Sequence, residues 1–269
     1  MNKMHGSVVV TGAASGIGLA VVDLLLDSGY KVLALDIFES EEIPYTSSTH
    51  ETLLKRQETH GIEQIEVYRC DVREYDELNA QVVSYVASRS QRFGDLGLSA
   101  AIACAGVVDG REYSWHLPKD VERLIVDTNL FGVMNLARAT IDQIIESSDP
   151  IKRFIAVSSV AGVKALPRLG AYVASKHGVN GYVKSLALEL RGTNVTVNVV
   201  SPGSTRTEIL EQSARVYGLE SSSRFADQHL TQRLIEPKEI ADAVMFLLSE
   251  QANSITGSVL AVDAGLSLT

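Results

Sequence analysis

Short apolar segments alternate with longer amphipathic ones along the chain of 269 residues. The apolar segments are rich in Val, Ile and Ala, and they predict β-strands over residues 7–11, 31–36, 65–70, 98–104, 152–158, 194–200 and 258–262. The segments between them predict helices over residues 16–28, 51–59, 75–92, 118–147, 170–191 and 237–249.

The predicted strands are apolar on both faces, which is typical of a parallel sheet covered by helices on both sides. No repeat or Pro/Gly-rich linker divides the sequence, so we expect one α/β domain over residues 1–269. Its architecture should be doubly wound, with about seven parallel strands. In such sheets ligands bind at the carboxyl ends of the strands, where the strand order reverses.

Composition and charge narrow the classes of function. The net charge of −9 argues against binding to nucleic acid, which needs a positive surface. No apolar run approaches the roughly 18–20 residues that span a membrane, and the N-terminus has no signal-peptide layout, so we expect a cytoplasmic protein. Two cysteines make no disulfide scaffold, and six scattered His residues predict no metal site.

A glycine-rich turn, Thr11–Gly18, joins the first strand to the first helix. Such a turn lets backbone N–H groups approach a pyrophosphate, and the helix dipole favours the anion. Its spacing is G-x-x-x-G-x-G rather than G-x-G-x-x-G. A flexible turn without a ligand is the alternative. The candidate binding residues are Gly12, Ser15, Gly16, Ile17 and Gly18.

An acidic residue, Asp36, ends the second strand eighteen residues beyond Gly18. A carboxylate there can accept hydrogen bonds from the ribose hydroxyls of a dinucleotide and repels a 2′-phosphate. Since no Arg or Lys stands at 13–15 or 37, the pattern favours NAD over NADP.

Residues after the third and fourth strands can complete such a site. Asp71, next to Val72, could reach the adenine amino group, or it could simply begin the next helix. Ala105 and Gly106 are small enough for the backbone to lie against the cofactor. With a 3-2-1-4 strand order, a disulfide between Cys70 and Cys104 is out of reach.

The catalytic candidates follow the fifth strand. Ser159 comes first, Tyr172 follows thirteen residues later, and Lys176 lies four residues further on. Residues at i and i+4 share a helix face, so the ammonium should lower the pKa of the phenol. The phenol then suits general acid/base work on an alcohol or carbonyl oxygen, to which Ser159 would donate a hydrogen bond. Tyr172 and Lys176 alone would more often be ordinary helix residues.

Together these motifs resemble the short-chain dehydrogenase/reductase family over essentially the whole chain, which implies a Rossmann fold. The resemblance implies that Asn129 organises a water that relays protons to Lys176, which also binds the nicotinamide ribose. It further implies that the 202–207 segment holds the nicotinamide carboxamide. The residues of this segment that should bind the cofactor, together with Tyr172 and Lys176, are Pro202, Gly203, Thr205 and Thr207. One departure is Ala103-Cys104-Ala105-Gly106, where the family usually has Asn-Asn-Ala-Gly.

Residues 36–60, with Ile43-Pro44-Tyr45-Thr46, and residues 201–218 resemble the mycofactocin-associated branch of the family. This resemblance implies tightly held NAD and mycofactocin as an external acceptor. Leu53 and Leu54 could pack a short helix over the adenine and slow NAD release. The alternative is that residues 36–60 form an ordinary surface loop and NAD exchanges freely.

The expected function is NAD-dependent interconversion of a secondary alcohol and a ketone, with Tyr172 as general acid/base. A non-catalytic NAD sensor is the alternative, and a nucleotide-sugar epimerase would be longer. Residues 204–234 should form a lid whose apolar side chains favour an apolar or alicyclic substrate. Helix faces in 121–146 and 171–190 predict a homo-oligomer, and the resemblance implies a tetramer. The lid side chains are Ile209, Leu210, Val216, Tyr217, Leu219 and Phe225.

Overall fold

A seven-stranded parallel sheet forms the centre of the computed structural model, which describes residues 6–39, 42, 50–93 and 96–269. The order β3-β2-β1-β4-β5-β6-β7 reverses direction between β1 and β4. The strands are β1 (Ser7–Thr11), β2 (Lys31–Asp36), β3 (Ile65–Arg69), β4 (Leu98–Ala103), β5 (Arg153–Val157), β6 (Thr196–Pro202) and β7 (Val259–Val262). This confirms the doubly wound α/β class, and the expected 3-2-1-4 order is present.

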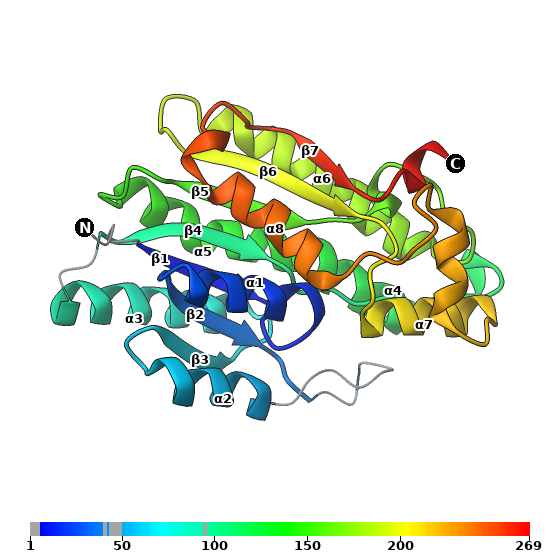
Figure 1. Ribbon diagram of the computed structural model, residues 1–269, viewed down its shortest axis with the longest axis horizontal. Helices are drawn as coiled ribbons and strands as arrows, with labels where there is room; N and C mark the ends of the chain where they lie inside the picture. Colours follow the sequence, from blue (N-terminus) through cyan, green and yellow to red (C-terminus); the bar gives the residue numbers. More distant parts are fainter. Residues whose placement is uncertain (1–5, 40–41, 43–49, 94–95) are drawn as a thin grey trace.

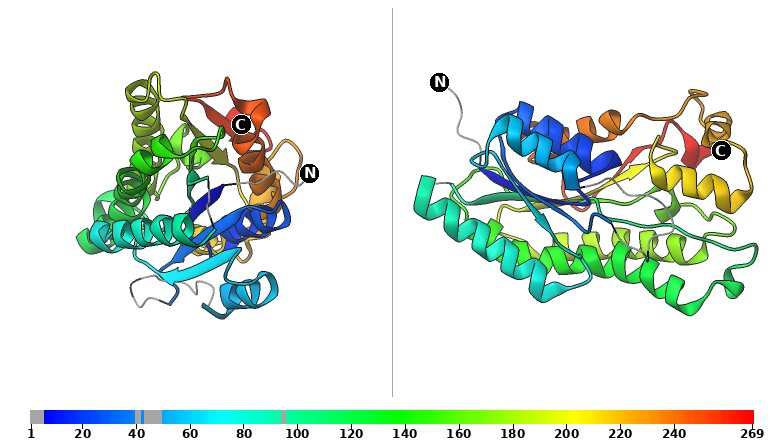
Figure 2. Two further views of the ribbon diagram at one scale, coloured as in Figure 1. Left: turned by 90° about the vertical axis from the view of Figure 1, so that its left-hand side faces the viewer. Right: turned by 90° about the horizontal axis from the view of Figure 1, so that it is seen from below.

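Helices cover both faces of the sheet (Figure 2). α1, α2 and α8 lie on one face, and α3, α5 and α6 lie on the other. Among the described residues no helix is both long enough and apolar enough to cross a membrane. The helices are α1 (Gly16–Asp27), α2 (His50–His60), α3 (Tyr75–Phe93), α4 (Lys119–Val126), α5 (Gly132–Glu146), α6 (Gly170–Glu189), α7 (Glu208–Tyr217) and α8 (Pro237–Leu248).

The alternation of side chains along each strand builds two cores. Val8 and Val10 of β1 face the α1/α8 layer, whereas Val9 between them faces the α3/α5/α6 layer. All three side chains are fully buried. Because burying a Val side chain stabilises a fold by roughly 1.5–3 kcal/mol, a register shift of one residue would be costly. The strands are therefore held in position, and their carboxyl ends lie toward α4 and α7 (Figure 1).

Two helical regions differ from the prediction. The single helix expected over residues 118–147 is interrupted by a π-helical turn, Asp127–Phe131, which separates α4 from α5. α7 was not predicted, although the sequence carries its signals. The Thr207 hydroxyl caps its first turn by accepting from the Leu210 N–H, and Gly218 ends it with φ of 69°.

The role expected for the helix in the 36–60 segment is wrong. α2 is the connection between β2 and β3, and Leu53 is fully buried in the core beneath it. Neither Leu53 nor Leu54 lines the cavity described below, so these side chains do not cover an adenine. Hydrophobic burial against the sheet decides this placement. Residues 40–41 and 43–49, which include Ile43-Pro44-Tyr45-Thr46, lie outside the described residues.

Candidate active site

A cavity of about 510 Å³ opens at the carboxyl ends of the strands and runs from the ends of β2 and β3 to α7. Parts of the chain that are distant in sequence, from Gly12 to Leu266, meet in it. It collects every residue predicted for the site except Asn129. The predicted residues that line it are Gly12, Ser15, Gly16, Ile17, Gly18, Asp36, Asp71, Val72, Ala105, Gly106, Ser159, Tyr172, Lys176, Pro202, Gly203, Thr205 and Thr207.

The glycine-rich turn forms one wall, and the structure explains its glycines. Gly12 has φ of 63°, and a Cβ there would lie 2.6 Å from the Ala105 nitrogen. A Cβ on Gly18 would lie 1.9 Å from the Gly12 carbonyl oxygen. Only glycine fits these two positions, because the turn packs against the β4 loop and against itself. The N-terminus of α1 thereby faces the cavity, which Ser15 and Ile17 also line.

Asp36 lies at the end of β2 with its side chain nearly buried. One carboxylate oxygen accepts from the Ala14 N–H at 2.9 Å and the other from the Phe38 N–H at 3.0 Å. Burial raises the pKa of Asp36, and these backbone hydrogen bonds oppose that rise. Each oxygen keeps a lone pair that can accept a ligand hydroxyl.

Arg73 is a lining residue that the sequence analysis missed. Its guanidinium donates to both oxygens of Asp71, with the shortest contact at 2.6 Å, and lies 2.7 Å from Glu42. The hydrogen bond to Asp71 raises the pKa of Arg73 further. This cation is therefore surrounded by two carboxylates, which makes it a poor partner for a phosphate. The only signal in the sequence was its position two residues after Asp71.

Asn129 lies behind the cavity in the π-helical turn, fully buried. Its amide accepts from the Val107 N–H at 2.7 Å and donates to the Val107 carbonyl at 2.9 Å and to Ser175 at 3.2 Å. It thus fixes the loop that follows β4. In that loop Cys104 replaces the usual Asn, and its N–H donates to the Thr11 carbonyl. Both cysteines, Cys70 and Cys104, are free as expected.

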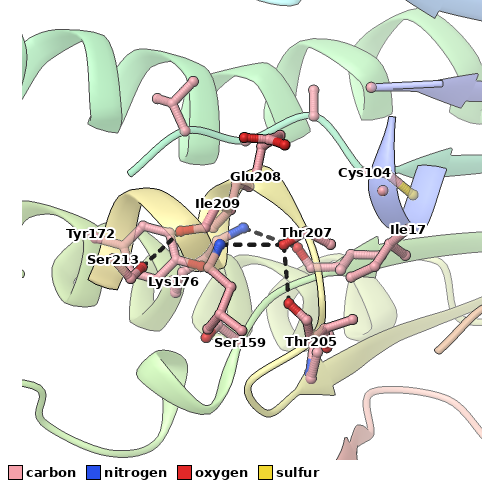
Figure 3. Close-up of a pocket in the computed structure, with 18 of the residues that line it drawn as sticks. Ile17, Cys104, Ser159, Tyr172, Lys176, Thr205, Thr207, Glu208, Ile209 and Ser213 are labelled. Atoms are coloured by element: carbon pink, nitrogen blue, oxygen red, sulfur yellow. Dashed lines mark hydrogen bonds between the residues drawn. The ribbon is translucent and has the colours of Figure 1, made fainter. Parts of the chain in front are cut away.

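Ser159, just after β5, and Tyr172 and Lys176 of α6 point into the same cavity (Figure 3). The Lys176 ammonium lies 5.7 Å from the centre of the Tyr172 ring and donates to the Val157 carbonyl at 3.1 Å. The sequence-based expectation that these side chains are neighbours is confirmed. A hydroxyl and a phenol on one wall can hold and protonate a ligand oxygen.

The expected lowering of the Tyr172 pKa is wrong. Burial raises the pKa of Tyr172, and the hydrogen bond with Ser159 only partly opposes this rise. Burial also lowers the pKa of Lys176 to about 8. Both groups lie deep in the wall of the cavity. The cost of removing their charged forms from water therefore outweighs the attraction between an ammonium and a phenolate.

The opposite wall is the segment from Pro202 to Thr207, between β6 and α7. A Cβ on Gly16 would lie 3.0 Å from the Thr207 methyl, so this segment approaches the glycine-rich turn. The Thr205 hydroxyl donates to the Gly203 carbonyl at 3.1 Å.

The end of the cavity under α7 is mostly apolar. Of the side chains expected from the lid, all but Val216 line it; Val216 instead packs beside Val107 and Leu169. Further apolar lining residues lie outside residues 204–234 and were missed because only the fold brings them here. They are Val107, Leu124, Val160, Leu166, Pro167, Leu169 and Leu266.

Hydrogen bonds join α7 to the loop that follows β4 and to the segment that precedes α6. Gln212 donates to the buried Asp109 at 3.3 Å, and the Tyr217 hydroxyl donates to the Pro167 carbonyl at 2.8 Å.

Within the described ranges, no three His, Cys, Asp or Glu side chains gather in a way that could hold a metal ion.

A parallel doubly wound sheet with a glycine-rich turn, a Ser, and a Tyr and Lys four residues apart defines a dinucleotide-dependent class of oxidoreductase. A family model described as enoyl-(acyl carrier protein) reductase matches residues 12–267. The chain belongs to the short-chain dehydrogenase/reductase family.

Relatives cover the chain from end to end. A (−)-trans-carveol dehydrogenase of Rhodococcus erythropolis is 31% identical over 100% of both chains. A 3-oxoacyl-[acyl-carrier-protein] reductase of Thermotoga maritima is 32% identical over 98% of this chain and 99% of its own length. The crystal structure of carveol dehydrogenase from Mycobacterium avium in complex with NAD superposes with a TM-score of 0.89. It is 28% identical and covers 100% of this chain and 99% of its own.

Proposed function

We propose that this protein is an NAD-dependent oxidoreductase that interconverts a secondary alcohol and a ketone. The observation that carries the proposal is the meeting of Ser159, Tyr172 and Lys176 in the cavity that begins at the glycine-rich turn. Such a turn at a helix N-terminus suits a pyrophosphate, and Asp36 suits the adenosine ribose. NAD would supply the hydride acceptor or donor when bound.

Four residues of the chain are proposed to bind the substrate and cofactor and to move the proton. Ser159 donates a hydrogen bond to the substrate oxygen, and Tyr172 moves the hydroxyl proton. Lys176 binds the nicotinamide ribose. Asn129, which bonds Val107 and Ser175, holds the loop beside Gly106 and is proposed to complete the proton path to Lys176.

An apolar or alicyclic substrate fits this site best. The end of the cavity under α7 offers mainly hydrocarbon, from side chains such as Leu169, Ile209 and Phe225. A substrate with one oxygen and a compact apolar body leaves no polar group unpaired there. Carveol, the alcohol named for two of the relatives, has this chemistry.

Tightly held NAD, with mycofactocin as its external acceptor, is implied by the resemblance of residues 36–60 and 201–218 to one branch of the family, and a cover formed by Leu53 and Leu54 was expected to add to it. Leu53 instead belongs to the core, and Leu54 does not line the cavity. We propose a retained NAD and mycofactocin as its external acceptor on the resemblance alone, without a contribution from Leu53 and Leu54.

Tyr172→Phe tests the assignment, with Tyr182→Phe on the same helix as the matched control. Removing only the Tyr172 hydroxyl should lower kcat at least about 100-fold, because it removes the proton-transferring group. NAD binding, measured by titration, should change little. The assay follows NADH at 340 nm over a panel of alicyclic and linear secondary alcohols. If Tyr172→Phe keeps a substantial fraction of the wild-type rate, the assignment is wrong.

A further inference from the structure

His229 follows the short helical turn Ser222–Gln228, and its side chain is only 2% exposed. Its ring bridges two backbone segments. Nε2 lies 3.1 Å from the Ser204 nitrogen, and Nδ1 lies 2.6 Å from the Arg233 carbonyl oxygen. Ser204 belongs to the 202–207 segment that forms a wall of the cavity.

These two partners determine the proton on the ring. A carbonyl oxygen can only accept, so Nδ1 carries the proton and donates to Arg233. A backbone N–H can only donate, so Nε2 is unprotonated and accepts from Ser204. His229 is therefore held as the neutral Nδ1–H tautomer, and only this form satisfies both contacts.

The ring lies directly behind the wall of the cavity. A Cβ on Gly203 would lie 3.0 Å from Nε2 of His229, so the peptide at 203–204 packs against the imidazole. Further along the wall, the Ile235 N–H donates to the Ser204 carbonyl and the Arg206 N–H donates to the Ile235 carbonyl. The segment from His229 to Ile235 thus supports the wall from behind, and His229 is the side chain by which it does so.

The charged residues of the neighbouring segments are engaged elsewhere. The Asp263 carboxylate accepts from the N–H groups of Gly265 and Ser267. The Arg233 guanidinium donates to Glu239 at 2.6 Å and 2.7 Å. The imidazole therefore forms its hydrogen bonds with the backbone at Ser204 and Arg233.

We propose that His229 is a positioning residue for the nicotinamide half of the cofactor. By accepting from the Ser204 N–H, its Nε2 orients the 203–204 peptide. The chain continues from this peptide to Thr205 and Thr207, which line the cavity. The inference rests on the proposed function and on the family resemblance, which implies that the 202–207 segment holds the nicotinamide carboxamide. A purely packing role would need the shape of the ring and not an acceptor at Nε2.

Two amide variants separate the two contacts. In His229→Gln the amide reaches the position of Nε2 and can still accept from Ser204. In His229→Asn the shorter amide reaches the position of Nδ1 and can still donate to Arg233, but it leaves Ser204 unpaired. Each variant keeps one polar contact, but the His229→Asn side chain is one methylene smaller than that of His229→Gln, so its loss of volume has to be measured separately. Thermal unfolding of both measures the structural part of the effect.

The readout is binding of NADH and of ADP-ribose, which lacks the nicotinamide. His229→Asn should weaken NADH binding about ten-fold, which is the worth of one hydrogen bond, and leave ADP-ribose binding unchanged. His229→Gln should bind both ligands within about two-fold of wild type. Equal NADH affinity in the two variants, or a parallel loss of ADP-ribose affinity, would overturn the proposal.

Wild-type protein that binds neither ligand would instead contradict the proposed function, so the two failures are distinguishable. If His229→Asn does not fold, the binding of NADH and ADP-ribose by His229→Gln still tests the proposal. Loss of NADH binding in that variant, with ADP-ribose binding intact, would show that an acceptor at the Nε2 position is not sufficient.

Discussion

Lys176 is a cation whose burial works against the stability of the fold. It is 4% exposed, and burial lowers its pKa to about 8 from the ordinary 10.5. Below pH 8 the folded protein holds an ammonium in a site that disfavours charge, whereas the unfolded chain holds it in water. The folded state therefore carries a penalty at neutral pH, which is partly offset by the hydrogen bond to Val157.

We predict that Lys176→Met raises the free energy of unfolding at pH 7 by about 1–3 kcal/mol and abolishes turnover. The gain should shrink as the pH rises from 8 to 10.5, because the wild-type folded state loses its proton earlier than the unfolded chain. Denaturant unfolding at a series of pH values measures this. Lys184→Met, an exposed position on the same helix, is the control and should show no such trend. A destabilised Lys176→Met protein at pH 7 would contradict the argument.

Asp36 should decide the choice of coenzyme. We predict that wild type prefers NAD to NADP, since the carboxylate repels a 2′-phosphate and the nearby Arg73 is paired with Asp71 and Glu42. Asp36→Asn removes the charge at nearly constant shape and should reduce the preference about ten-fold or more. The ratio of kcat/KM for the two coenzymes is the measurement. A wild-type enzyme that prefers NADP would refute this reading of Asp36.

At the scale of elements, the C-terminus of α8 depends on one buried side chain. Arg153 of β5 is 1% exposed and donates to the carbonyls of Leu247 and Ser249 at 3.0 Å, and also to Asn253. The last carbonyls of a helix have no partner within the helix. A guanidinium inserted between the sheet and α8 supplies these partners and joins the two layers.

We predict that Arg153→Met lowers the free energy of unfolding by about 2–4 kcal/mol, because it leaves these carbonyls buried without donors. Arg206→Met, which removes an exposed ion pair with Glu236, should change it by less than about 0.5 kcal/mol. Urea unfolding of the two variants provides the comparison. Equal effects would mean that the Arg153 contacts contribute little.

At the scale of the whole molecule, large apolar side chains remain exposed beside α5 and on α6. Phe131, just before α5, is 48% exposed, and Leu188 of α6 is 74% exposed. We predict that the protein self-associates through this layer, as a tetramer at micromolar concentration. Leu188→Asp should shift the sedimentation coefficient toward smaller species. Ile62→Asp, an equally polar change at an exposed loop position, should not. A wild-type protein that sediments as a stable monomer would contradict the prediction.

The pattern of residues predicts the strands, their parallel arrangement and most of the cavity. Val8, Val9 and Val10 are apolar in succession, and this local pattern requires burial on both faces of the sheet. Strand ends then bring Gly12, Asp36 and Ser159 to one edge, because parallel strands share their direction. Spacing alone also placed Tyr172 beside Lys176, since both lie on one helix face.

The environment of these groups follows from the packing of the whole chain and not from the local pattern. Burial reverses the shift expected for the pKa of Tyr172 and lowers the pKa of Lys176, and burial depends on contacts distant in sequence. The same holds for Leu53, whose apolar side chain fits a core or a cofactor equally well until the sheet beneath it is present. His229 had no local signal, because its partners Ser204 and Arg233 are backbone groups, which leave no trace in the residue types.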